Sequence, residues 1–287
     1  MDRRSFLRLG ALTSAAAPAA LLGSVRDASA EQESGTEFVG MLIDTTRCIG
    51  CQACEVACAK ENGLPMPAMG PQPDSEDRPT EVDQFTIVNK FATEKGPVWV
   101  KKACNHCSQP ACATACLVNA MEKTMEGPVI WHADRCLGCR YCMIACPFEV
   151  PKFEFDKAIP KITKCTMCYE TRVSKGRPTA CSEACPQGAI LFGTRRELYE
   201  EAWRRISAKP DMYSHHLYGQ REVGGTEVMY LASVGFEALG FRADLGTQPY
   251  SEMTREFLYS VPMVLTILPA LLYGISKAGE GEKEAAR

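Results

Sequence analysis

The sequence predicts an α+β protein in which short strands and helices form two tandem units, followed by one transmembrane helix. Three observations support this prediction. The 16 cysteines of the 287-residue chain fall into four groups of four with similar spacing. Short β-branched segments at 85–91 and 98–102, divided by a turn signal, lie between the groups. Residues 257–275 then form a stretch without a charged side chain.

Length and composition limit the classes of protein. A chain of 287 residues suffices for one large or two small domains. The formal net charge of -3 and the lack of a long basic run argue against a nucleic-acid partner. Cysteine is abundant, but less so than in disulfide-stapled miniproteins, which are also much shorter. No Cys-x-x-Cys-His sequence occurs, so no covalently attached c-type haem is expected.

The clearest motif runs from Cys136 to Pro147, where Cys136, Cys139 and Cys142 are spaced three apart and Cys146 follows. This Cys-x2-Cys-x2-Cys-x3-Cys-Pro spacing is typical of a cubane iron–sulfur cluster. Three thiolates on one tight loop can hold three corners of the cube, and the fourth usually ligates a different cluster. Zinc sites favour two Cys-x2-Cys pairs instead. The alternative to an iron–sulfur protein is an adaptor without redox activity that zinc or disulfides stabilise.

The other cysteines repeat this motif with variations, and such repetition fixes the architecture. The first group keeps the spacing, the second widens one gap by two residues, and the fourth inserts a loop before its third cysteine. These groups are Cys48, Cys51, Cys54 and Cys58; Cys104, Cys107, Cys112 and Cys116; and Cys165, Cys168, Cys181 and Cys185. All 16 cysteines are predicted ligands, and four [4Fe-4S] clusters are expected.

Residues 1–30 are predicted to be a twin-arginine signal peptide. Arg3 and Arg4 precede a short, weakly apolar stretch, and Ala28-Ser29-Ala30 offers a cleavage site. The twin-arginine route exports proteins that are already folded with their cofactors inside. Clusters could therefore be assembled in the reducing cytoplasm and delivered to the periplasmic side of the membrane. This resolves the conflict with the disulfides that an exported, cysteine-rich protein would otherwise suggest.

The C-terminal end is predicted to anchor the protein in the membrane. As a helix, residues 257–275 would span about 28 Å, close to the hydrocarbon thickness of a bilayer. The prolines in this stretch are tolerated better in membrane helices than in soluble ones. A buried core helix is the alternative. With the clusters outside, the charged tail at 276–287 would be cytoplasmic.

Between these ends the sequence predicts two regions. Residues 31–206 form the four-cluster domain, which ends in an amphipathic helix over 195–206. Residues 207–256 are broken by glycines and form an irregular linker or partner-binding segment, with a short helix over 228–239. Within it, the pair His215-His216 suggests a metal or quinone site, but such a pair more often lies in a polar loop.

The sequence shows no chemistry other than electron transfer. No nucleophile–base pair, nucleotide-binding loop or acid–base pair of carboxylates stands out, so no catalytic residue is assigned. Basic side chains next to predicted ligands either stabilise the reduced clusters or are ordinary solvated charges; they are Arg135, Arg140, Lys152 and Lys164. A chain of clusters without a substrate site predicts an electron-transfer subunit.

The order of the four groups, the loop between Cys168 and Cys181, and Cys185-Pro-Gln-Gly-Ala-Ile-Leu-Phe-Gly193 resemble the four-cluster iron–sulfur subunits of bacterial respiratory oxidoreductases. These include subunits of dimethyl sulfoxide, polysulfide and nitrate reductases. The resemblance covers about residues 40–206 and implies tandem bacterial-ferredoxin-like 4Fe-4S domains. Leu117 departs from the pattern, because a proline often follows this cysteine. Every cysteine is kept, whereas nitrate-reductase relatives replace one ligand and carry a three-iron cluster.

A twin-arginine signal combined with a C-terminal membrane helix is most similar to the HybA-type subunit of periplasmic uptake hydrogenases and to subunits of sulfate-reducer transmembrane redox complexes. This similarity implies a catalytic partner, a nickel–iron hydrogenase or alternatively a molybdopterin oxidoreductase. It also implies a polytopic membrane subunit that reacts with quinone. The expected location is the periplasmic side of the cytoplasmic membrane, with a single C-terminal helix as the anchor.

The same resemblance implies that ligands cross between the groups. Each cluster would take three cysteines of one group and the last cysteine of another. The implied sets are Cys48, Cys51 and Cys54 with Cys185; Cys165, Cys168 and Cys181 with Cys58; Cys104, Cys107 and Cys112 with Cys146; and Cys136, Cys139 and Cys142 with Cys116.

Overall fold

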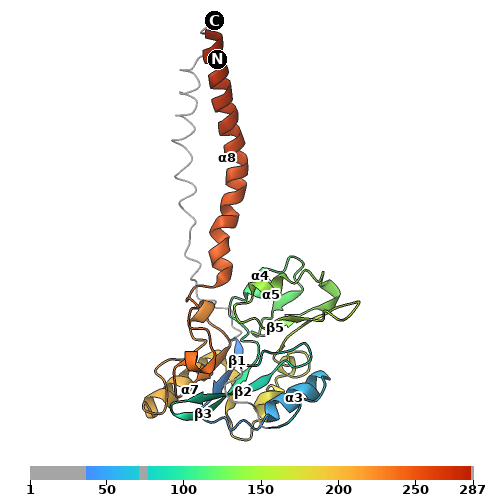
Figure 1. Cartoon of the computed structure of the whole chain (residues 1–287), viewed down its shortest axis with the longest axis vertical. Helices are drawn as coiled ribbons and strands as arrows, with labels where there is room; N and C mark the ends of the chain where they lie inside the picture. The colour runs from blue at the N-terminus through green and yellow to red at the C-terminus, as the bar shows by residue number, and fades with distance from the viewer. Residues whose placement is uncertain (1–36, 71–76, 286–287) are drawn as a thin grey trace. The chain divides into compact units, whose positions relative to one another are not determined.

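A three-stranded sheet organises the protein in the computed structural model, which describes residues 37–70 and 77–285 (Figure 1). Its strands are β1 (Val39–Asp44), β8 (Ile190–Thr194) and β9 (Val228–Leu231), in the order β8-β1-β9. β8 is antiparallel to β1, and β9 is parallel to it. The predicted signal peptide lies outside the described residues.

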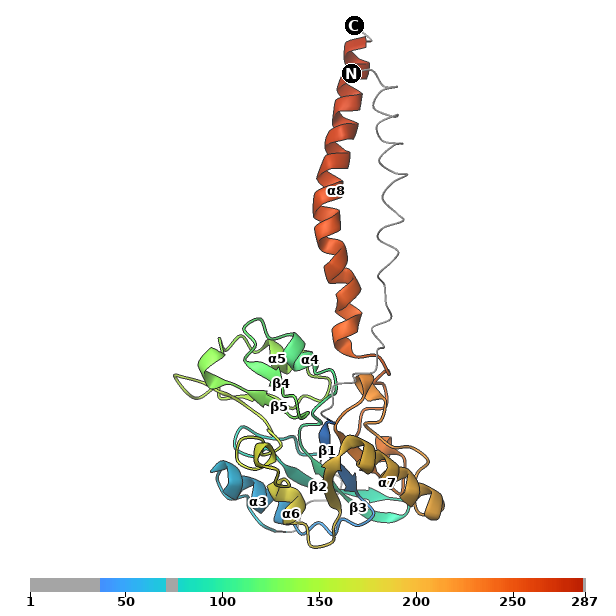
Figure 2. The ribbon, with the colours of Figure 1, turned by 180° about the vertical axis from the view of Figure 1, so that it is seen from behind.

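The sheet is buried on both faces. Because successive side chains of a strand point to opposite faces, Met41 and Ile43 of β1 contact one apolar cluster and Leu42 contacts another. The first cluster includes Val88 and Val100 of the adjacent hairpin together with several cysteines. The second is covered by α7 (Arg195–Ala208), as Figure 2 shows. Cysteine groups and helix therefore cover different faces.

Helix α7 confirms the predicted amphipathic helix and extends it by two residues. It begins with a capping box, in which Thr194 and Glu197 exchange side-chain-to-backbone hydrogen bonds. Leu198, Ala202 and Ile206 are buried on one face and pack against Leu42 and the other apolar residues of that cluster. Their spacing of four residues puts them on one stripe of the helix, which fixes α7 to the sheet.

Three antiparallel hairpins complete the strands. β2 (Ile87–Thr93) pairs with β3 (Gly96–Lys102), which confirms the two predicted strands with a small shift of the first. The other two hairpins are shorter: β4 (Met121–Lys123) pairs with β5 (Val129–Trp131), and β6 (Lys152–Phe153) pairs with β7 (Ile162–Thr163).

Four short helices follow or interrupt the cysteine loops: α3 (Ala53–Asn62), α4 (Ala111–Thr114), α5 (Tyr141–Ala145) and α6 (Ala180–Glu183). Single 3-10 turns lie at η1 (Ala133–Arg135), η2 (Val173–Lys175), η3 (Glu222–Gly224) and η4 (Phe236–Leu239). The combination of short strands and helices around cysteine loops agrees with the predicted mixed α and β fold.

The predicted helix over 228–239 is wrong in its first half. Residues 228–231 form β9, all four are buried, and only η4 at the end is helical. A continuous apolar run of this length is compatible with a buried strand or a buried helix, so its periodicity does not decide between them. Its neighbour β1 provides the hydrogen bonds that make it a strand.

The C-terminal segment is one long helix, α8 (Tyr250–Ala285), which extends beyond the predicted 257–275 at both ends. Pro262 and Pro269 lie inside it. In the part of the chain that the structure describes, no helix combines the length and the apolarity that crossing a membrane requires, so the predicted transmembrane helix is not confirmed.

Candidate iron–sulfur cluster sites

The loops of the first and third cysteine groups have the same backbone conformation. Gly50 and Gly138 stand two residues after the first cysteine, with φ of 71° and 67°, and Gln52 and Arg140 stand four after it, with φ of 57° and 60°. A Cβ on Gly50 would lie 2.3 Å from the indole of Trp99, so only glycine fits there. These left-handed residues turn the loop tightly, so that its three cysteines stay on one side.

Strand pairing brings the last cysteine of the fourth group to the first group. Ile43 of β1 is paired with Ile190 of β8 in an antiparallel ladder. The chain that follows Ile43 and the chain that precedes Ile190 therefore leave the sheet at the same end. Cys48 and Cys185 lie five residues from these paired positions, one on each chain.

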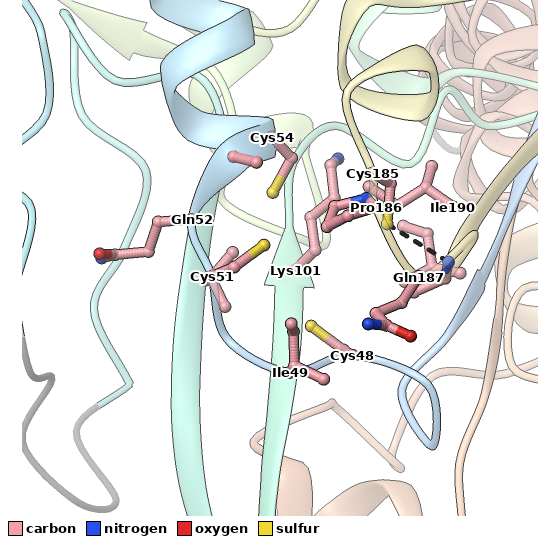
Figure 3. A pocket seen from close by; sticks show the side chains of 14 residues that line it. Cys48, Ile49, Cys51, Gln52, Cys54, Lys101, Cys185, Pro186, Gln187 and Ile190 are labelled. Atoms are coloured by element: carbon pink, nitrogen blue, oxygen red, sulfur yellow. Dashed lines mark hydrogen bonds between the residues drawn. The ribbon is translucent and has the colours of Figure 1, made fainter.

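The first candidate site results directly from this pairing. Its pocket is lined by Cys48, Cys51, Cys54 and Cys185, and their sulfur atoms point toward one another in Figure 3. Lys101 and apolar side chains such as Ile43 complete the lining. Three cysteines from one loop and one from a distant segment thus surround one space.

The hairpin β4–β5 repeats the construction. Met121 is paired with Trp131, Cys116 precedes Met121 by five residues, and Cys136 follows Trp131 by five. Cys116 and Cys136 pack against the same small apolar cluster as Cys142. The thiol of Cys142 also interacts electrostatically with Cys136, Cys116 and Cys139.

The remaining cysteines form two further clusters of neighbouring side chains. Cys58 and Cys168 both interact electrostatically with Cys165 and Cys181. The other consists of Cys107 and Cys112, which both interact with Cys104 and Cys146. Each of the 16 cysteines thus lies near other cysteines of the set that the resemblance implied for it. Their ligation of iron stays a prediction.

Burial controls the protonation of these thiols. It raises the pKa of Cys48 and of Cys142 to about 11, and that of Cys112 and of Cys168 to about 12. Buried thiols without a metal are therefore neutral at physiological pH and poor nucleophiles. A bound metal deprotonates its thiol ligands, so cluster binding would release protons.

Backbone amides point at cysteine sulfurs in a repeated pattern. The amides of Gly138 and Met167 donate to the Sγ of the cysteine two residues earlier, both at 3.4 Å. The amides of Ala120 and Ala189 donate to the cysteine four residues earlier, at 3.1 and 3.3 Å. Such donors stabilise negative charge on cluster sulfurs and are one means of setting a reduction potential.

Cys58 differs because it lies inside α3 rather than at the end of a short helix. The side-chain amide of Asn62, four residues on, lies 3.6 Å from its Sγ and supplies the donor. The same amide also donates to the Cys58 carbonyl at 2.8 Å.

The basic residues singled out in the sequence have varied surroundings. Arg140 stacks on Phe153 and Phe155, with its guanidinium 5.4 and 5.5 Å from the ring centroids. Arg135 pairs with Glu122 at 3.5 Å, and Lys152 is half-buried in β6. Lys164 is buried, and its ammonium donates to the carbonyls of Val129 and Cys165.

The histidine pair does not form a metal site. His216 is largely exposed, and its Nε2 lies 2.7 Å from a carboxylate oxygen of Glu222. More generally, the described residues contain no three His, Cys, Asp or Glu side chains placed to hold a single metal ion. Ligands of a cubane do not converge on one ion, because they surround a whole cluster.

The sequence did not predict a role for Lys101 in the cluster sites. It is only 2% exposed, and its Nζ has no hydrogen-bond partner. A buried ammonium without a partner is costly, so an anionic group is expected beside it. A cluster with four thiolate ligands is such a group, and soft thiolates are the ligands that iron–sulfur clusters take. The residues present therefore fit the predicted cofactor.

Comparison with known proteins agrees with this site. Residues 98–195 match the domain family described as the 4Fe-4S dicluster domain. The fold and the cysteine sites thus define an iron–sulfur electron-transfer protein.

Similarity to curated proteins extends beyond this domain. A protein of Nitratidesulfovibrio vulgaris (Hildenborough) is 43% identical over 100% of this chain and 81% of its own length. The Hydrogenase-2 operon protein HybA of Escherichia coli O157:H7 is 36% identical over 94% of each chain. The iron–sulfur subunit of the nitrate-inducible formate dehydrogenase of Escherichia coli K12 is 35% identical over 80% of this chain and 76% of its own. The chain belongs to the HybA-like family of iron–sulfur electron-transfer subunits.

Proposed function

We propose that the chain binds four [4Fe-4S] clusters through crossed ligand sets and relays electrons between a periplasmic catalytic subunit and a membrane subunit that reacts with quinone. The observation that carries this proposal is the pocket in which Cys185 meets Cys48, Cys51 and Cys54. The repeated construction at the β4–β5 hairpin supports the same wiring for a second site.

The residues of the chain have three tasks in this function. When bound, each cluster supplies one-electron redox chemistry. The cysteine loops hold the cluster in place, and their amides donate to the thiolate sulfurs. Apolar neighbours such as Ile43 and Val88 exclude water from the first site, which strengthens electrostatic interactions there.

Metal analysis tests the stoichiometry. Four complete groups of cysteines predict about sixteen irons per chain and no zinc when the protein is purified without oxygen. Bound clusters would also give broad absorbance at roughly 400 nm. Stoichiometric zinc, or about eight irons in fully loaded protein, would contradict the four-cluster proposal. Zinc without redox activity would instead support a zinc-stabilised adaptor.

The favoured catalytic partner is a nickel–iron hydrogenase. Support comes from the similarity over 94% of the chain to a protein named for the hydrogenase-2 operon. The similarity to a formate dehydrogenase subunit supports the second candidate, a molybdopterin oxidoreductase. Affinity purification from solubilised membranes, with identification of co-purifying subunits and their metals, distinguishes them. Nickel in the complex supports the first, and molybdenum or tungsten supports the second.

We also propose that the chain works on the periplasmic side of the cytoplasmic membrane and is exported by the twin-arginine route. The support is the Arg3-Arg4 pair in the sequence. Replacing both arginines by lysine should leave loaded protein in the cytoplasm. Normal periplasmic accumulation of this variant would contradict the export proposal.

Attachment to the membrane is assigned to the apolar part of α8. Its support is the set of large apolar side chains that this helix exposes between Met263 and Ile275. Truncation before Phe257 should release the cluster domain into the soluble fraction. Membrane attachment of the truncated chain without its partners would show that another segment anchors it.

A further inference from the structure

Lys101 lies in the interior of the protein, next to the first cluster site. It is the sixth residue of β3 and is paired with Val88 of β2. Its side chain lines the pocket of Cys48, Cys51, Cys54 and Cys185, as Figure 3 shows. A lysine is almost never fully buried unless it is paired, so this position requires an explanation.

Lys101 also interacts electrostatically with the neighbouring site. Its strongest electrostatic partners are Cys181 and Cys165, which belong to the set with Cys58 and Cys168; Tyr230 and then Cys54 of the first site follow. Cys54 and Cys181 pack in one apolar cluster, so the two sites lie close together. One ammonium therefore interacts with cysteines of two different sites.

Two other polar side chains in the vicinity have hydrogen-bond partners of their own. The carboxylate of Glu55, next to Cys54, accepts hydrogen bonds from the amide of Val88 and from Gln84 and lies 3.7 Å from Arg78. The hydroxyl of Tyr230 donates to Asn105 at 3.2 Å. The Nζ of Lys101 has no hydrogen-bond partner.

Two other lysines near cysteines differ from Lys101 in this respect. Lys164 donates to two backbone carbonyls, and Lys123 pairs with Glu227 at 3.0 Å. The neighbour Lys102 pairs with Asp77 and is partly exposed. Each of these ammonium groups has a hydrogen-bond acceptor in the protein, whereas that of Lys101 has none.

We infer that Lys101 is the shared counter-ion of the two cluster sites and raises the reduction potential of both. The inference rests on the proposed cluster binding. Each reduction adds a negative charge, and a positive charge fixed in a low-dielectric interior stabilises the reduced form. Because the ammonium lies near both sites, it stabilises the reduced form of each cluster.

The test replaces Lys101 by methionine, which keeps most of the length of the side chain and removes the charge. The matched control is Lys102→Met at the next position of the same strand. The loaded full-length proteins are titrated with reductant without oxygen, and each cluster is followed by EPR. We expect the reduction equilibrium constants of two clusters to fall about tenfold or more in Lys101→Met, about 59 mV for a one-electron couple. Both potentials should fall, those of the other two clusters should change less, and Lys102→Met should resemble the wild type.

The assignment to two specific sites is checked with ligand variants. The two clusters that shift in Lys101→Met should be those perturbed by Cys54→Ser and by Cys168→Ser. Unchanged potentials in loaded Lys101→Met, or an equal shift of every cluster, would overturn the inference while leaving cluster binding intact. A wild-type protein without cluster signals would instead refute the proposed function.

Two further variants keep the test decisive if Lys101→Met does not load its clusters. Lys101→Arg retains a positive charge and Lys101→Gln does not. Wild-type potentials in Lys101→Arg and lowered potentials in Lys101→Gln support the counter-ion. Loading by Lys101→Arg alone also supports it, because the charge is then needed for assembly. Equal potentials in both variants, or failure of all three to load, would overturn a role based on charge.

Discussion

The two pairs of proposed cluster sites share one cysteine motif but have different surroundings. The sheet pair consists of Cys48, Cys51, Cys54, Cys58, Cys165, Cys168, Cys181 and Cys185. The hairpin pair consists of Cys104, Cys107, Cys112, Cys116, Cys136, Cys139, Cys142 and Cys146. Five cysteines of the sheet pair are buried, against three of the hairpin pair. Members of the sheet pair belong to the main apolar core, which includes residues of β1, β2, β3 and β9.

The hairpin pair has much less cover. Four of its cysteines pack with the short strands β4, β5 and β7; they are Cys112, Cys116, Cys136 and Cys142. Large apolar side chains next to cysteines of this pair are exposed. Leu117 is 86% exposed, Ile144 is 80% exposed and Leu137 is 71% exposed. The comparison teaches that the cysteine motif sets the arrangement of the cysteines, whereas elements outside the motif set their burial. Cluster potentials depend on burial and solvent exposure, so the two pairs should differ in potential.

The largest expected effect is the loss of a cluster after removal of a crossed ligand. On the proposed wiring, Cys58→Ser perturbs the cluster of Cys165, Cys168 and Cys181, and leaves that of Cys48, Cys51 and Cys54 less affected. Serine oxygen is a poorer ligand for iron than thiolate, so one iron or the whole cluster should be lost. Redox-titrated EPR of Cys58→Ser beside Cys54→Ser makes the measurement.

The hairpin pair gives the matched experiment. Cys116→Ser should perturb the cluster of Cys136, Cys139 and Cys142, because Cys116 and Cys136 leave the β4–β5 hairpin at the same end. Identical spectral changes in Cys58→Ser and Cys54→Ser would argue against crossed ligation. Unchanged quinone-linked turnover in a variant that has lost a cluster would show that this cluster lies off the electron path.

The second effect concerns stability. Leu198 of α7 is 4% exposed and packs against the sheet, so Leu198→Ala should cost about 2–5 kcal/mol. Ile144 is 80% exposed beside the hairpin pair, and Ile144→Ala should change stability by less than about 0.5 kcal/mol. Thermal unfolding without oxygen compares the two variants. Equal losses of stability in the two variants would mean that the surroundings of the hairpin pair are as tightly packed as the sheet. The two pairs of sites would then not differ in packing.

A third, smaller effect isolates the connection between sheet and helix. Thr194 ends β8 and caps α7, and its hydroxyl accepts a hydrogen bond from the amide of Glu197 at 3.3 Å. Thr194→Ala should cost about 1 kcal/mol, and Thr194→Ser should restore most of it because the oxygen is retained. The thermal midpoints of the two variants provide the check. Similar losses in both would assign the role of Thr194 to its methyl group.

The smallest expected effect is an ion pair that connects two segments of the sheet pair. Arg172, after Cys168, contacts Glu61 at the end of α3 at 2.7 Å. Hydrogen bonds from Thr171 and Arg172 hold the pKa of Glu61 below its ordinary 4.5. Arg172→Met should cost about 1 kcal/mol or less at pH 7. Arg135→Met, which breaks a more exposed pair at the hairpin sites, should cost less still.

The pH dependence of the Arg172 effect follows from the lowered pKa. A carboxylate with a depressed pKa in the folded state stabilises above its unfolded pKa, and the contribution is lost as pH falls through the folded value. Arg172 also pairs with Glu183 at 2.5 Å and lowers the pKa of that carboxyl. The difference between wild type and Arg172→Met should thus be constant from pH 7 to about 5 and shrink below the ordinary pKa of the two carboxyl groups. Thermal unfolding without oxygen at a series of pH values measures it. A difference that grows on acidification would assign the effect to another group.

The cysteine spacing in the sequence predicted the ligands, their loops and the repetition of the motif. These features are local: Gly50 and Gly138 turn their loops within a few residues, and the amides of Ala120 and Ala189 reach the cysteine four positions earlier. The period of apolar residues likewise predicted α7, because residues four apart share a helix face. Local sequence therefore suffices wherever the interacting atoms are a few residues apart.

Only the tertiary structure decided what depends on distant segments. Pairing of β1 with β8 places Cys48 beside Cys185, and pairing with β1 makes residues 228–231 a strand rather than a helix. In the sequence, Lys101 looks like an ordinary strand lysine. Only the tertiary structure shows that its ammonium is buried near Cys54 and Cys181 and has no hydrogen-bond partner. The reason is physical: strand partners and the burial of a charge are fixed by contacts between segments far apart in the chain, and no local periodicity encodes them.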